Sequence, residues 1–164
     1  MRKCLIFFVV LLCSSCSSDH GQPIATLSYE GVSITPSGYG YKISFTSDTD
    51  LLALLGDSIG DGLVCALEDD LDFSIGHYLK RSGRGSVRYV NDSTGGHYDS
   101  TVIFRKSEDS QGQESILGKK ELRNVLAVRD FVVCTYRVNN SEHRTYFSKL
   151  MRVPTKDFLN EIDK

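Results

Sequence analysis

The stretch FVVCTYRV, residues 131 to 138, decides the fold class of this chain. Its apolar and polar side chains alternate, which is typical of a β-strand that buries one face. Four side chains share that face: Val132, Cys134, Tyr136 and Val138. The stretch GLVCALE, residues 62 to 68, places Cys65 in the same way between Leu63 and Leu67. Both cysteines are therefore predicted to lie on apolar faces of strands.

The same period of two residues recurs along the rest of the chain. It is clearest from Tyr39 to Phe45, where aromatic residues and Ile43 alternate with small or polar ones. LSYEGVSIT (27–35) reads as two short strands around a turn at Glu30 and Gly31. The remaining strand candidates are FSIGHYLK (73–80), SVRYV (86–90), YDSTVIFRK (98–106) and RTYFSKLMRV (144–153).

Helical patterns are few. SDTDLLALLG (47–56) has an acidic start and a leucine-rich turn, and TKDFLNEIDK (155–164) offers Thr155 as an N-cap before an apolar stripe. KKELRNVLAV (119–128) fits a helix or a strand. The predicted fold is mainly β: a β-sandwich or β-rich α+β single domain over residues 24–164, with one disulfide and a short C-terminal helix.

The first 15 residues are predicted to be a secretory signal peptide. Arg2 and Lys3 precede the apolar run from Leu5 to Leu12, which is too short to span a bilayer as a helix. Small and polar residues follow this run. The mature chain is therefore expected outside the cytoplasm.

The sequence Ser14-Ser15-Cys16 resembles a bacterial lipobox, in which small residues precede a lipidated cysteine. The resemblance implies a lipid on Cys16, with residues 16–23 as the lipidated N-terminus and tether. Ser17 after that cysteine implies sorting to the outer membrane. Cys13 stands where the family usually has Leu, and ordinary cleavage nearby, releasing a soluble protein, is the alternative.

Removal of the leader leaves an acidic domain with few cysteines. Of the 19 basic residues, Arg2 and Lys3 are lost, so 17 face 21 acidic residues, a net charge of −4 that argues against nucleic acid as a partner. Only Cys65 and Cys134 remain beyond the lipidation site. An even pair in an oxidising compartment predicts a disulfide, with two buried free thiols as the alternative.

The segment Gly56-Asp57-Ser58-Ile59-Gly60 fits the nucleophile-elbow pattern G-x-S-x-G and resembles the first block of the GDSL esterases and lipases. That resemblance implies a nucleophilic role for Ser58. A serine nucleophile needs a base and oxyanion donors. None of the four histidines has an Asp three places before it, as the family's D-x-x-H motif requires. We therefore expect a glycine-rich loop here and no enzymatic activity.

Residues 57–68 also align with a calcium-binding EF-hand loop, with Asp57 and Glu68 at its first and twelfth positions. Ile59 and Cys65 occupy the third and ninth positions, where oxygen ligands are needed. Zinc, phosphate-loop and dinucleotide motifs are absent from the sequence. The sequence therefore predicts no metal and no cofactor, although calcium at 57–68 stays open.

Two charged clusters are candidates for contact with a partner. The basic one, in KRSGRGSVR (80–88), is interpreted as an exposed hairpin tip: Lys80, Arg81, Arg84 and Arg88. The acidic one is either a solvated loop or a contact surface for a basic partner: Glu68, Asp69, Asp70 and Asp72.

A small, disulfide-bonded β-domain on a lipid tether, without a visible catalytic set, is typical of a binding protein. Its leader and layout resemble periplasmic immunity lipoproteins, which protect a bacterium from toxic effectors, notably those of type VI secretion. The resemblance implies that the domain covers an effector's active site in the periplasm. The contact is expected at the acidic cluster 68–72 or at an exposed tyrosine patch.

Three other functions stay open. SVRYV (86–90) resembles a loop of the membrane-bound lysozyme inhibitors, although the downstream tryptophan is absent and Phe104 is the nearest substitute. A structural or assembly lipoprotein of the envelope, such as a pilotin, has the same layout. The GDSL-like esterase ranks last.

Overall fold

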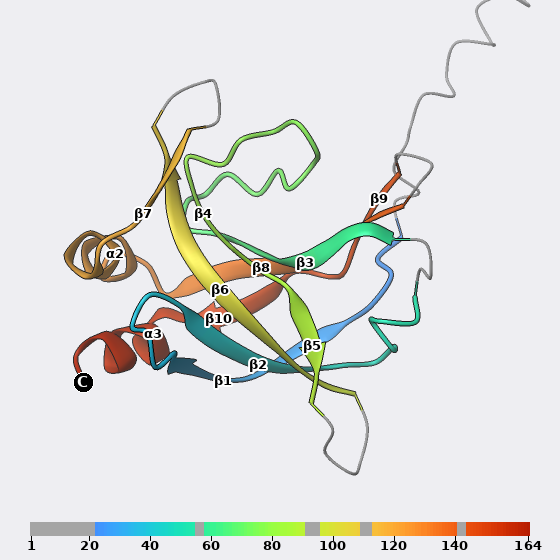
Figure 1. Ribbon diagram of the computed structural model, residues 1–164, viewed down its shortest axis with the longest axis horizontal. Coiled ribbons are helices and arrows are strands. Elements are labelled where there is room, and N and C mark those ends of the chain that lie inside the picture. The colour runs from blue at the N-terminus through green and yellow to red at the C-terminus, as the bar shows by residue number, and fades with distance from the viewer. Residues whose placement is uncertain (1–21, 55–57, 91–95, 109–112, 141–143) are drawn as a thin grey trace, which may run out of the picture.

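The structure is a computed structural model that describes residues 22–54, 58–90, 96–108, 113–140 and 144–164. The described part is mainly β, with one helix before the last three strands and one at the C-terminal end. In chain order, and as labelled in Figure 1, the elements are β1 (Leu27–Ile34), β2 (Tyr41–Ser47), β3 (Ser58–Ala66), β4 (Arg81–Gly85), β5 (Val87–Tyr89), β6 (His97–Ser107), β7 (Glu114–Ile116), α2 (Lys119–Leu126), β8 (Phe131–Asn140), β9 (Thr145–Phe147), β10 (Met151–Pro154) and α3 (Thr155–Ile162).

The strands form one curled antiparallel sheet in the order β1-β2-β6-β4-β3-β8-β10. The long strand β6 joins the two halves of this sheet. Its first half pairs with β2 and β5, and its second half pairs with β4 and β7. Figure 1 shows β6 crossing the molecule diagonally between these partners. The strand β9 extends the sheet at the far end of β8.

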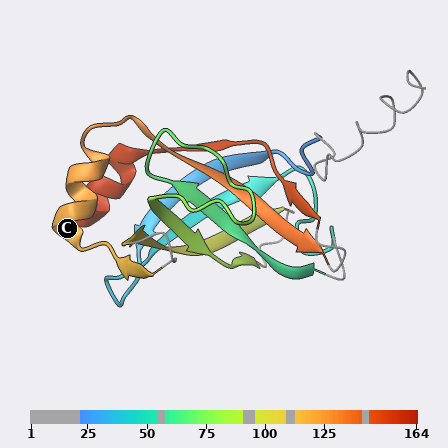
Figure 2. The ribbon, with the colours of Figure 1, turned by 90° about the horizontal axis from the view of Figure 1, so that it is seen from above.

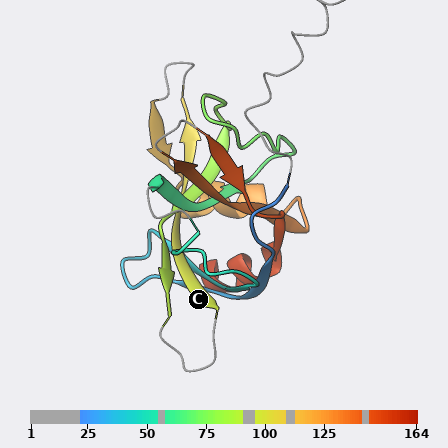
Figure 3. The same ribbon diagram turned by 90° about the vertical axis from the view of Figure 1, so that its right-hand side faces the viewer.

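The two outer strands, β1 and β10, come together when the sheet curls (Figure 3). At one end, the N–H of Ile24 donates to the carbonyl of Phe147 (2.9 Å). At the other end, α3 covers the opening between them. The Tyr29 hydroxyl donates to Asp157 (2.6 Å), and the N–H of Ile34 donates to Glu161 (3.1 Å). Helix α3 thus covers part of the edge of β1 and pairs one of its N–H groups.

The interior of the curl is the hydrophobic core, and the disulfide lies within it. Four side chains of β8 are at most 1% exposed: Val132, Cys134, Tyr136 and Val138. Cys65 on β3 lies directly opposite Cys134 on β8, and a disulfide joins them. Both the shared face of the strand and the disulfide were predicted from alternation and cysteine count, and both are confirmed.

The predicted C-terminal helix is confirmed as α3. Phe158 is fully buried and packs edge-on against Tyr41 and Phe104, with ring centroids 5.6 and 5.5 Å apart. The predicted N-cap is wrong, because Pro154 holds that position without a side-chain hydrogen bond. The buried hydroxyl of Thr155 donates instead to the carbonyl of Arg129 (2.6 Å), which satisfies it inside the protein.

The ambiguous stretch 119–128 is resolved as the helix α2, with Leu122 and Leu126 buried four residues apart on one face. Arg123 of α2 donates two hydrogen bonds to Asp163, at 3.0 and 3.1 Å, and so fastens α2 to the end of α3. Figure 2 shows the two helices side by side at one end of the sheet. No helix in the described ranges is long and apolar enough to cross a membrane.

Three sequence-based expectations about elements are wrong. Residues 27–34 form one strand with a bulge at Glu30 rather than two strands around a turn. Residues 144–153 do pair antiparallel with β8, as expected of a hairpin, but they form two short strands, because the Ser148 hydroxyl between them accepts the N–H of Tyr136 and interrupts the pairing. Residues 73–80 form no strand at all, as described below.

The helix expected over 47–56 is also absent from residues 47–54, the part of that stretch that the structure describes. Leu51 is 2% exposed, and its N–H donates to the Tyr98 hydroxyl (3.1 Å) inside the sheet. Asp50 accepts the N–H of Leu52 (3.1 Å). The burial of Leu51 therefore favours a turn over a regular helix.

Candidate functional site

The loop from Leu67 to Lys80, here named the acidic loop, links β3 to β4 and lies over the outer face of the sheet (Figures 1 and 3). Phe73 and Leu79 are each 6% exposed. They pack on Val64 and Ala66, the outward side chains of β3. The end of strand β3, residues 63–66, is therefore buried on both faces, and the loop is fixed by a small hydrophobic cluster of its own.

Hydrogen bonds set the path of the acidic loop between these two anchors. Asp70 accepts the N–H of Asp72 (3.1 Å), and Asp72 accepts the N–H of Ser74 (2.9 Å), so each carboxylate closes a local turn. The Arg137 guanidinium of β8 donates to the carbonyl of Phe73 (3.1 Å). Gly76 has a φ of 87°, a backbone angle that favours glycine.

This anchoring explains why 73–80 is not a strand. Phe73 and Leu79 alternate with polar residues as they would in a strand, but both point down onto β3 from a folded loop. The glycine in the middle of the stretch was the one local signal of a turn.

The four acidic residues of the predicted contact surface differ in their surroundings. Glu68 is an internal partner, because the Arg81 guanidinium donates to it at 3.1 Å and its side chain is 25% exposed. Asp69 is fully exposed, and its nearest cation is Arg129 at 3.9 Å. Asp70 and Asp72 are about half exposed. Three carboxylates therefore face outward, at 69, 70 and 72.

His77 lies between two of these carboxylates, with Nε2 2.7 Å from Asp70 and Nδ1 3.6 Å from Asp72. Its hydrogen bond to Asp70 raises the pKa of His77 above 6.5. The N–H of Asp72 and then His77 lower the pKa of Asp70, and the hydroxyl and N–H of Ser74 lower that of Asp72. The hydrogen bonds of the loop therefore favour a protonated His77 and ionised Asp70 and Asp72.

Apolar side chains stand among these charges. Leu71 is 40% exposed, Ile75 is 59% exposed and Tyr78 is 58% exposed. A pocket of about 270 Å³ has both Leu71 and Leu150 in its lining. A fixed loop that presents apolar groups among carboxylates is suited to bind another protein. The acidic residues were predicted from the sequence as a contact, whereas the exposed Leu71 and Ile75 beside them were not.

The basic cluster is not a hairpin tip, as the sequence suggested. Arg81 and Arg84 lie on β4 and Arg88 lies on β5, which continue one another along β6. Arg81 pairs with Glu68, and Arg84 lies 3.8 Å from Glu114. Because Arg81 and Arg84 each pair with an acidic residue from another part of the chain, the basic residues do not act as one cluster.

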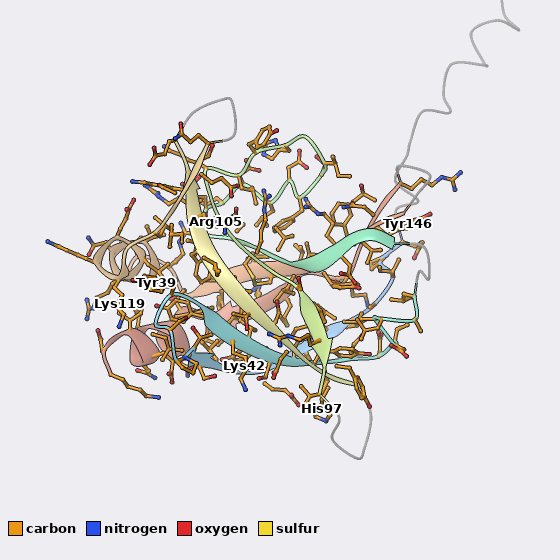
Figure 4. All side chains as sticks on the ribbon, in the orientation of Figure 1. Tyr39, Lys42, His97, Arg105, Lys119 and Tyr146 are labelled. Atoms are coloured by element: carbon orange, nitrogen blue, oxygen red, sulfur yellow. A yellow bond between two sulfur atoms is a disulfide. The ribbon has the colours of Figure 1, made fainter. Side chains whose placement is uncertain are left out.

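The proposed tyrosine patch is also divided. The exposed tyrosines lie on three separate elements: Tyr39 before β2, Tyr78 in the acidic loop, and Tyr89 on β5. Tyr39 and Lys119 border a pocket of about 520 Å³ at the end of the sheet near the helices (Figure 4). Its floor includes the buried aromatic residues Tyr41 and Phe104.

The backbone of the described residues 58–66 matches neither alternative interpretation of 56–68. Ser58 is the first residue of β3, whereas a nucleophile elbow is a turn from a strand into a helix. Residues 58–66 are an extended strand, which cannot wrap around an ion as a calcium loop does. Within the described ranges, no group of three or more His, Cys, Asp or Glu could hold a metal ion.

The predicted lipidation site, Cys16, and the signal peptide lie outside the described residues. Comparison of the chain with protein families, with curated proteins and with solved structures finds no match.

Proposed function

We propose that this chain is a lipid-anchored binding protein of the bacterial periplasm, and that it acts as an immunity protein that neutralises an antibacterial effector. The acidic loop carries the proposal. It is fixed by buried side chains and hydrogen bonds, yet it presents three carboxylates and three exposed apolar side chains. A surface ordered in advance loses little conformational entropy on binding.

The chemistry of the acidic loop defines the partner it would fit. Carboxylates at 69, 70 and 72 favour a basic surface and speed its approach. Leu71, Ile75 and Tyr78 supply the apolar contact that gives most interfaces their affinity. An effector with a basic active-site rim would meet both requirements. Covering that rim blocks the effector without any chemistry from this chain.

The proposed anchor is compatible with such contact. The first described segment, blue in Figure 2, begins at the end of the sheet away from α2 and α3, where the N–H of Ile24 donates to the carbonyl of Phe147. The eight residues 16–23 span at most roughly 30 Å when extended. A lipid on Cys16 would therefore hold the domain close to the membrane, with the outer face of the sheet free to meet a partner.

Competition between sibling cells tests the proposal. Cells that lack this gene should be killed by siblings that secrete the cognate effector, and the wild-type gene should restore survival. Ile75→Asp and Asp69→Lys should not restore it, because they alter the exposed side chains of the acidic loop without touching its anchors. Leu52→Asp, at an exposed apolar residue outside the acidic loop (47% exposed, against 59% for Ile75), is the matched control and should protect.

Other outcomes favour other functions. Unchanged survival of the deletion strain contradicts immunity, and loss of a surface structure would point to an assembly role. Protection of cell wall from lysozyme by the purified protein would point to a lysozyme inhibitor. Equal protection by wild type and both loop variants would remove the acidic loop from the mechanism.

A further inference from the structure

A second feature of the outer face is a hollow of about 350 Å³ beside the acidic loop. Strands β3, β4 and β8 line it, and we name it the arginine hollow after Arg84 and Arg137 in its wall. Ser86 and Asn139 add polar groups to the same wall.

Register and alternation explain why the sheet is hollowed at this point. On β3, Leu63 faces the interior, so its neighbour Gly62 faces outward. Gly62 pairs with Arg137 of β8 on one side, and Gly85 of β4 pairs with Leu63 on the other. A Cβ at Gly62 would lie 2.8 Å from the carbonyl oxygen of Gly85. The floor between the two arginines is therefore bare backbone.

The positive charge in this hollow is incompletely paired. Arg137 is partly buried and donates to the carbonyl of Phe73 (3.1 Å). No carboxylate of a described residue lies within 4.0 Å of its guanidinium. Burial, and then the charge of Arg84, lower the pKa of Arg137, so the two cations repel each other across the floor. Among the described carboxylates, Arg84 pairs only with Glu114, at 3.8 Å, and Glu114 also contacts Arg105.

Asp61 also lines the hollow, but its carboxylate accepts the Tyr136 hydroxyl (3.1 Å). Tyr136 belongs to the interior face of β8. One oxygen of the Asp61 carboxylate is therefore engaged by a side chain of the interior face.

We propose that the arginine hollow binds an oxyanion, a carboxylate or a phosphate, between Arg84 and Arg137. Guanidinium groups present planar sets of N–H donors that match both anions. An oxyanion there would pair the partly buried charge of Arg137 and relieve its repulsion with Arg84. The hollow, of about 350 Å³, has room for such an anion, and the Ser86 hydroxyl in its wall is a further donor.

The arginine hollow adjoins the acidic loop and therefore extends the surface that a partner could contact. Arg137 contacts the loop directly through the Phe73 carbonyl, so a positive site adjoins the negative one. A partner would need a basic group opposite the acidic loop and an acidic group opposite the arginine hollow, and this requirement adds selectivity. Binding of an oxyanion here does not depend on the proposed immunity function.

Titration of the full-length chain in detergent with two probes tests this inference. The probes are inorganic phosphate and the peptide acetyl-Gly-Glu-Gly-amide, whose only charge is a carboxylate, each at constant ionic strength. The guanidinium ¹⁵Nε resonances of Arg84 and Arg137 should shift and saturate with at least one probe. Tighter binding of the peptide indicates a protein carboxylate as the natural ligand, and tighter binding of phosphate indicates a phosphate.

Variants separate a specific site from general attraction of anions. Arg84→Gln and Arg137→Gln should each weaken binding about tenfold, the loss expected for a charge-assisted hydrogen bond. Arg152→Gln removes an exposed arginine that lies over the Phe131 ring, and it should leave binding unchanged. If Arg137→Gln fails to fold, the more exposed Arg84 carries the test. Shifts that do not saturate, or an equal loss in Arg152→Gln, overturn the inference.

Discussion

The disulfide allows a prediction of how much free energy of unfolding is lost when it is removed. Cys65 and Cys134 are separated by 69 positions in sequence, and both are fully buried at the centre of the curled sheet. Closing a loop of that length removes entropy from the unfolded chain worth about 4 kcal/mol at 25 °C. The double variant Cys65→Ala/Cys134→Ala should lose that free energy of unfolding, and somewhat more for the missing sulfur contacts.

Urea unfolding followed by circular dichroism measures this loss. With a slope of about 2 kcal/mol per molar urea, the midpoint should fall by about 2 M. The wild-type chain with both thiols reduced is the control, since it keeps the sulfur atoms and lacks only the bond. A change below about 1 kcal/mol in both samples would refute the reasoning, because the cross-link would then not limit the unfolded chain.

Three further predictions concern the acidic loop, the sheet and α3. The pKa of His77, measured by NMR, should be above 6.5. Protonated His77 should stabilise the folded loop at acid pH, and this stabilisation should be lost as the pH rises through the folded-state pKa. A pKa at or below 6.5 contradicts the contact with the loop aspartates. Gly85→Ala should lower the free energy of unfolding by about 3 kcal/mol, because the new Cβ would lie 2.2 Å from a backbone carbonyl oxygen. Gly31→Ala, whose Cβ would have no atom within 4 Å, should change it by less than about 0.5 kcal/mol. Equal effects of the two variants in urea unfolding would show that the clash is relieved. Tyr29→Phe should cost about 1 kcal/mol in the same assay by removing the hydrogen bond to Asp157, and unchanged stability would mean that β1 and α3 do not depend on it.

Much of the sheet could be predicted from local pattern. In strands β2, β6 and β8 the residue types alternate, because each strand buries one face in the interior and so every second side chain is buried. The disulfide followed from cysteine count and from the matching faces of two strands. In each case the evidence lay within a few neighbouring residues.

The acidic loop could not be predicted in the same way, because distant residues fix it. Its Phe73 carbonyl is held by Arg137, 64 positions later, and Phe73 itself packs on β3. These contacts turn an alternating sequence into a loop. The division of the basic cluster has the same cause, since Glu68 and Glu114 are tertiary partners of Arg81 and Arg84.

The arginine hollow likewise depends on the pairing of strands. Gly62 and Arg137 are neighbours only through the register of β3 with β8. Neither residue is conspicuous in the sequence. A bare floor between two cations becomes visible once the order of the strands is known.

The central claim is that this chain acts by binding through the acidic loop. The most direct measurement is the affinity of the purified protein for the effector that kills cells lacking it, compared across the wild type, Ile75→Asp and Leu52→Asp. We predict tight binding by the wild type and by Leu52→Asp, and a loss of at least about 100-fold in Ile75→Asp, as expected for an anchor at the centre of an interface. Equal affinities of all three proteins, or no binding by the wild type, would contradict the account.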